Sequence, residues 1–163
     1  MKVGGKTMRG VIIEQLKHNY MTNINDLFSV MNGIEKKYNF FIYSYSCNDY
    51  PSEKLPAGVD YVWLTGAEFS NLVKENDIQF IFGLISAIPK DIPLAKILEN
   101  KLGYYDDGNA ELWMGNIDTQ IPEAEFEFIP YDSEYVVVIS KNDAILDLIN
   151  ANYSSTDMQK FMN

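Results

Sequence analysis

The pattern of apolar and polar positions predicts short strands alternating with amphipathic helices. A brief apolar run within 9–15 predicts the first strand. Apolar residues spaced by three and four positions then predict a helix over 24–32, with Asn23 as its N-cap and Gly33 as its stop. The aromatic and β-branched run 39–46 predicts a strand that is largely apolar on both faces.

The middle of the chain continues this alternation. Residues 47–58 contain two prolines and a glycine, which predicts a loop. Thr65 followed by Glu68 forms a capping-box pattern, and the helix that it opens is expected to close at Asn76. The other elements expected here are strands over 59–64 and 78–88 and a helix over 91–102.

The C-terminal third predicts a three-stranded meander and a last helix. Its strands are expected over 110–116, 124–129 and 135–139. In the second of these, the phenylalanines alternate with Glu123, Glu125 and Glu127, so the carboxylates are expected on a solvated face opposite the core. Ser140 with Asp143 three residues later is typical of a helix start.

These elements predict an α+β fold in a single domain. We expect a mixed, mostly antiparallel sheet that includes the C-terminal meander, with helices mainly on one face. The domain is expected over 8–153. Residues 1–7 are expected to be a flexible lead-in, and 154–163 a tail for which a short helical turn is one option.

Charge is unevenly distributed, and this excludes some functions. The chain has a net charge of −10, and residues 101–150 hold two Lys or Arg against eleven Asp or Glu. Binding to a phosphate backbone needs the opposite sign, so we expect no nucleic-acid partner. The longest apolar run, Phe80–Pro89, is too short to cross a membrane. A single cysteine, Cys47, favours the cytoplasm.

No residue pattern indicates catalysis, and we expect no cofactor and no metal. His18, the one histidine, has no arranged partner, and Cys47 lacks the basic setting of a reactive thiol. Residues 106–111 resemble a calcium loop only faintly, because Gly108 stands where a ligand is needed. Paired glycosidase carboxylates face each other across a cleft, unlike carboxylates on one strand.

The candidate binding residues are acidic and aromatic residues of the meander. Trp113 shares its parity along the strand with Glu111, so an aromatic side chain is expected among carboxylates, and such surfaces bind basic partners. The alternatives are that the carboxylates are merely solvated and that a helix covers Trp113. The candidate partner-binding residues are Glu111, Trp113, Glu123, Glu125 and Glu127.

Three stretches carry a resemblance to a known family. The opening Met8–Gly10, the run Ile78–Lys90 and the run Tyr131–Asn142 are similar to a bacterial family of uncharacterised proteins, of the domain of unknown function 2691 type. The match spans Met8 to about Tyr153, and Asn142 stands where the family more often has Asp. The family has no assigned activity, so the resemblance implies no catalytic residue.

Two classes of function remain open from the sequence. The first is a cytoplasmic bacterial interaction module whose acidic sheet face binds a basic protein, such as an immunity-type inhibitor of a basic toxin. The alternative is a small enzyme or a small-ligand-binding domain with a site near the 47–58 loop. We lean against an enzyme, and the oligomeric state is left open.

Overall fold

A single antiparallel sheet of seven strands is the framework of the protein. The computed structural model describes residues 9–14, 23–103 and 117–158. The strand order is β3-β2-β4-β5-β6-β1-β7, and every described strand pair is antiparallel. The strands are β1 Arg9–Ile13, β2 Tyr38–Cys47, β3 Tyr61–Thr65, β4 Phe80–Pro89, β5 Phe126–Tyr131, β6 Tyr135–Ser140 and β7 Ser155–Asp157.

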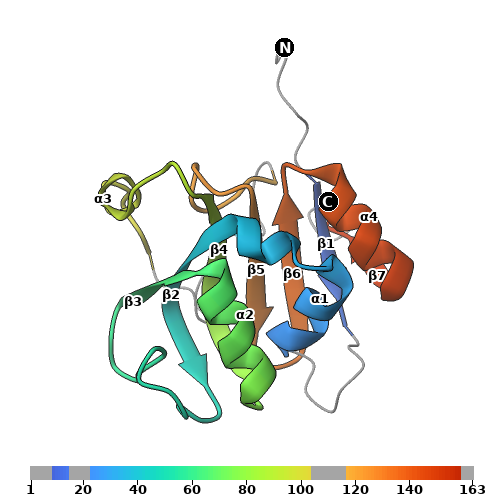
Figure 1. Cartoon of the computed structure of the whole chain (residues 1–163). Coiled ribbons are helices and arrows are strands. Elements are labelled where there is room, and N and C mark those ends of the chain that lie inside the picture. Colours follow the sequence, from blue (N-terminus) through green and yellow to red (C-terminus); the bar gives the residue numbers. More distant parts are fainter. Residues whose placement is uncertain (1–8, 15–22, 104–116, 159–163) are drawn as a thin grey trace.

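Helices cover mainly one face of this sheet. They are α1 Ile24–Met31, the 3-10 helix η1 Ile34–Lys37, α2 Gly66–Glu75, α3 Leu94–Ile97 and α4 Asp143–Asn152. Figure 1 shows α1, α2 and α4 lying across the near face, with α3 set apart at one end. The predicted α+β fold is therefore confirmed, although no described strand pair is parallel. None of the described helices has the length and apolar character needed to cross a bilayer.

Local capping explains where the helices begin. The side chain of Asn23 accepts a hydrogen bond from the N–H of Asn25 at 3.0 Å, as the predicted cap requires. Thr65 and Glu68 form the complete capping box of α2. The cap of α4 is Asn142, two residues beyond the predicted Ser140.

Three predicted elements differ in the structure. The helix expected over 91–102 is only Leu94–Ile97. It begins after Pro93, which stands at its N-cap, and beyond Ile97 the backbone forms three-residue turns in which Glu99 N–H bonds to Lys96 O and Asn100 N–H bonds to Ile97 O. Within the tail expected over 154–163, Ser155–Asp157 forms a strand that pairs with β1, and residues 159–163 lie outside the described ranges. The predicted meander placed the segment 110–116 next to the strand expected over 124–129. That strand is β5, and its neighbours in the sheet are β4 and β6. Residues 110–116, like the lead-in 1–7, lie outside the described ranges.

Both faces of the sheet are apolar, and each has its own core. The first core lies under α1, α2 and α4, where Phe28, Phe40 and Phe69 meet at ring distances of 5.3 to 5.5 Å. The second core lies on the opposite face, which we call the second face. It consists of Ile12, Phe41, Leu84, Ile88, Ile97, Ile121, Ala124, Ile129, Val137, Ile139 and Met158.

The packing of α2 against η1 depends on the absence of a side chain at Gly66. A Cβ at this position would lie 1.9 Å from the carbonyl oxygen of Glu35 and 2.7 Å from that of Tyr38. Both obstacles are backbone atoms, which cannot rotate away as the end of a flexible side chain can. The first turn of α2 therefore approaches η1 and β2 as closely as it does only with glycine at position 66.

We expect Gly66→Ala to lower the free energy of unfolding by at least about 2 kcal/mol, because the added methyl group forces α2 away from η1. Urea denaturation at constant pH measures this difference. Gly103→Ala is the matched control, since its added Cβ would meet no atom within 4 Å. Equal stabilities of the two variants would contradict the close approach of α2.

Candidate functional site

The alternation predicted for the strand around Phe126 and Phe128 is correct, but its consequence for the glutamates is not. Phe126 and Phe128 belong to the first core, and the side chain of Glu127 lies on the second face of the sheet. Glu127 is 0% exposed, so the predicted row of solvated carboxylates is wrong at this position. The physical reason is that the segment 117–124 folds over it and contributes Ile121 to the second core.

Glu127 is held by hydrogen bonds to both of its carboxylate oxygens. Ser86 Oγ donates to Oε2 at 2.7 Å, and the N–H of Ile121 donates to the same oxygen at 3.0 Å. The N–H of Gln120 donates to Oε1 at 2.5 Å. One buried side chain thus joins β4, β5 and the segment 117–124.

Burial makes the Glu127 carboxyl titrate near neutrality. Loss of solvation raises the pKa of Glu127 from an ordinary 4.5 to about 7, although its hydrogen bonds and the charge of Lys141 act in the opposite direction. Lys141 also donates to the carbonyl oxygen of Pro122, at the end of the same segment. The arrangement resembles a structural tie more than an exposed binding residue.

The described candidates Glu123 and Glu125 do not form a free acidic surface with Glu127. Glu123 and Glu125 are half-buried, and Glu123 Oε2 accepts a hydrogen bond from Asn100 at 3.1 Å. Glu111 and Trp113 lie outside the described residues. Among the described candidates, Glu123 and Glu125 are therefore partly exposed to solvent, and Glu127 is not.

The structure instead gathers aromatic side chains on the second face. Tyr61 lies opposite Tyr43, Trp63 lies opposite Phe41, and Tyr131 lies opposite both Phe82 and Tyr135. The rings of Tyr131 and Tyr135 stack at 5.2 Å, and that of Phe82 meets Tyr131 at 5.5 Å. We call the half-buried members the aromatic row: Tyr43, Tyr61, Trp63, Phe82, Tyr131 and Tyr135.

A break in β2 decides which aromatic residues join this row. Ser44 has a φ of 51°, and the pairing of β2 with β4 shifts register after Tyr43. Tyr43 packs on the second core, whereas Tyr45 packs on the first, so the regular alternation of side chains along β2 is interrupted at Ser44. Gly83 lies opposite this break and has a φ of 153°. A Cβ added at Gly83 would lie 3.3 Å from Tyr45 Cα, so glycine allows the two strands to approach closely here.

Acidic residues border the aromatic row. Asp60 immediately precedes β3, and Asp132 and Glu134 lie in the turn between β5 and β6; all three are exposed. Loss of solvation, followed by the charges of Tyr131, Glu134 and Asp132, raises the pKa of Tyr135 to about 12. None of the strands β2 to β6 contains a Lys or Arg. The local field at this end of the second face is therefore negative.

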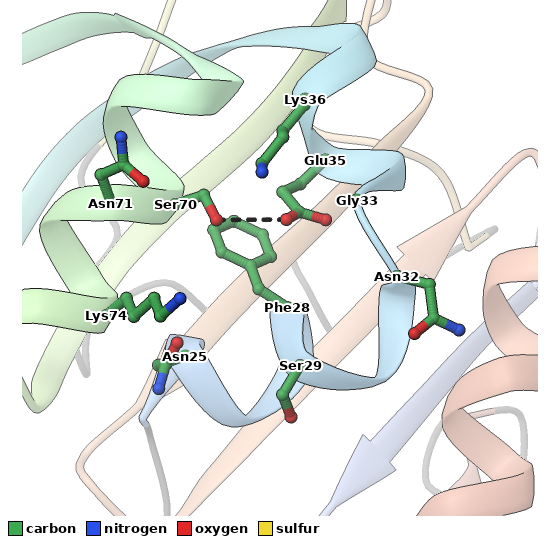
Figure 2. Close-up of a pocket in the computed structure, with 10 residues that line it drawn as sticks. All are labelled: Asn25, Phe28, Ser29, Asn32, Gly33, Glu35, Lys36, Ser70, Asn71 and Lys74. Carbon is green, nitrogen blue, oxygen red and sulfur yellow. Dashed lines mark hydrogen bonds between the residues drawn. The ribbon is translucent and has the colours of Figure 1, made fainter.

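A separate hollow of about 360 Å³ lies on the helical side, between α1, η1 and α2. Figure 2 shows Glu35 and Ser70 facing each other across it, with Lys36 and Lys74 also directed toward the enclosed space. Ser70 Oγ donates to Glu35 Oε1 at 3.1 Å. No sequence pattern indicated this site, because Glu35 stands in a polar stretch with no recognisable spacing.

The alternative site near the 47–58 loop has few side chains that are available for catalysis or for binding a ligand. Cys47 is buried, and loss of solvation raises the pKa of its thiol to about 12, which keeps it protonated and unreactive. Lys54 is paired with Glu68 at 3.1 Å beside a hollow of about 260 Å³. Across residues 9–14, 23–103 and 117–158, no three His, Cys, Asp or Glu side chains gather as metal ligands. His18 and residues 106–111 fall outside these ranges.

Comparisons with protein-family models, with curated proteins and with solved structures find no match for this chain. The resemblance carried by Met8–Gly10, Ile78–Lys90 and Tyr131–Asn142 therefore stays a prediction.

Stability should fall as the pH rises from about 4.5 to 7, because folded Glu127 keeps a proton that the unfolded chain has already released. This component is fully present below the unfolded pKa and lost above the folded one. It amounts to roughly 3 kcal/mol by the free energy of a pKa shift. Urea denaturation across this pH range measures it.

The variant Glu127→Gln should lack this component, since an amide does not titrate. Glu75→Gln, which removes an exposed carboxylate from α2, should follow the wild-type pH dependence. A pH profile of Glu127→Gln parallel to that of the wild type would show that the buried carboxyl does not titrate in this window.

Proposed function

We propose that the chain is a bacterial, cytoplasmic interaction module that binds a basic protein through the aromatic row and its acidic border. The observation that supports this most directly is a run of half-buried aromatic rings across five strands, next to exposed acids. The binding surface therefore differs from the one expected from the sequence, which included the buried Glu127. An immunity-type inhibitor of a basic toxin is the most concrete protein of this kind.

The aromatic row suits an anchor for a protein partner. Tyr and Trp are enriched among the residues that contribute most to interfaces, because their rings bury much surface with few rotatable bonds. Tyr61 and Trp63 lie on β3, an edge strand of the sheet. Among the described strands, none pairs with the outer edge of β3, which leaves this end of the row at the border of the sheet.

The acidic border determines which charge the surface of the partner must carry. The carboxylates of Asp60, Asp132 and Glu134 accelerate the approach of Lys or Arg side chains, and the faces of the neighbouring rings attract the same cations. Nucleic acid is disfavoured because its phosphates carry the same sign as this surface. The sheet surface thus combines apolar anchoring with attraction for positive charge.

Peptides selected from a random library by panning against the chain should be rich in Lys and Arg beside apolar residues. Their association rate, measured by surface plasmon resonance, should fall as salt is added. The double variant Asp132→Asn with Glu134→Gln should slow association about threefold to tenfold at low salt. Tyr61→Ala should weaken affinity by about tenfold if the ring is an anchor.

A matched control separates the local surface from the total charge. Glu75→Gln with Asp91→Asn changes the net charge by the same amount at exposed positions away from the aromatic row. This control should associate at nearly the wild-type rate. If both double variants slow association equally, or if the selected peptides are not basic, the proposed surface is wrong.

A further inference from the structure

The hollow between α1, η1 and α2 contains a buried carboxylate with an incomplete set of hydrogen bonds. Glu35 is 3% exposed. Its Oε1 accepts from Ser70, but its Oε2 is shielded from solvent and has no hydrogen-bond partner in the described part of the chain. Buried polar atoms are nearly always bonded, so this oxygen requires an explanation.

The residues around this oxygen provide the opposite charge at a distance. Lys36 and Lys74 line the hollow, and neither makes an ion pair with any described residue. In Figure 2 the ammonium group of Lys36 points toward Glu35 and Ser70, and that of Lys74 points into the hollow beside Asn25 and Phe28. The site therefore combines one buried acceptor with two exposed cations in a chain that is strongly acidic overall.

We propose that this hollow binds a small zwitterion that carries both an ammonium and a carboxylate group, as α-amino acids do. The ammonium donates to Glu35 Oε2, and the carboxylate lies between Lys36 and Lys74. Lys36 lines the hollow and is exposed, so its side chain is free to change rotamer when a ligand enters. A volume of about 360 Å³ falls at the lower end of the range of small-molecule sites, which suits a molecule of this size.

The incomplete bonding of Glu35 is understandable for a binding residue. A buried carboxylate that lacks a hydrogen-bond partner lowers the free energy of unfolding. A purely structural role for Glu35 does not explain why the fold keeps such a group. Groups that wait for a ligand often carry such a cost. Replacement of Glu35 by Gln should therefore leave the melting temperature unchanged or raise it, while binding is lost.

The experiment uses the full chain and the standard L-α-amino acids as probes. Binding is followed by amide chemical shifts in NMR spectra and by calorimetry. At least one amino acid should shift resonances of η1 and of α2 around Ser70 with a dissociation constant below about 1 mM. The matching carboxylic acid without the amine, and the matching amine without the carboxylate, should each bind at least about tenfold more weakly.

Variants assign the roles of the charged groups. Glu35→Gln should raise the dissociation constant at least about tenfold, since a charge-assisted hydrogen bond is lost. Lys36→Met and Lys74→Met should each raise it about threefold. Lys37→Met and Glu75→Gln are the matched controls, because neither residue lines this hollow.

Three results would overturn the proposal. One is that no amino acid shifts these resonances at about 10 mM, far above the affinity expected. Another is that the carboxylic acid binds as tightly as the amino acid, which removes the role of Glu35. The last is that Glu35→Gln lowers the melting temperature and leaves binding intact, which makes Glu35 a structural residue. None of these bears on the aromatic row, which lies on the other face of the sheet.

Discussion

Both faces of the seven-stranded sheet must be removed from water, and the helices cover only one of them well. The first core is roofed by α1, α2 and α4, whose buried apolar side chains each contribute about 1.5 to 3 kcal/mol. On the second face, the described cover consists of the single turn of α3 and the segment 117–124. The organisation of the described part of that face follows from this largely non-helical cover.

Glu127 is the residue that holds the segment 117–124 in this cover. The backbone N–H groups of Gln120 and Ile121 turn inward, and buried donors without acceptors would cost about 1 to 3 kcal/mol each. A carboxylate has enough lone pairs to accept from both and from Ser86 as well. Toward the β5–β6 turn, half-buried aromatic rings occupy the same face.

Sequence patterns predicted the framework well, because they act over a few residues. Caps at Asn23 and Thr65 and the alternation at Phe126 and Phe128 depend on local geometry, and the structure shows each of them. Period-two alternation, however, assigns Glu127 to a face without saying whether that face is covered. That outcome depends on a segment which folds back from six or seven residues earlier in the chain.

The aromatic row and the hollow were beyond sequence reasoning for related reasons. A single left-handed residue, Ser44, moves Tyr45 to the first core and leaves Tyr43 on the second. The hollow joins Glu35 to Ser70, which is 35 positions away, and the elements that carry them, η1 and α2, approach closely at Gly66. Neither a tertiary contact of this range nor a missing hydrogen bond leaves a periodic trace in the sequence.

The two buried glutamates support different roles because they are satisfied differently. Glu127 and Glu35 are both almost fully removed from solvent, yet the first accepts three hydrogen bonds and the second accepts one. Complete bonding offsets most of the cost of burial and fixes a segment in place, which is what a structural residue does. Incomplete hydrogen bonding leaves the cost of burying the Glu35 carboxylate uncompensated until a ligand donates a hydrogen bond to it. The same chemical group therefore serves as a tie on one side of the sheet and, in our proposal, as a receptor on the other.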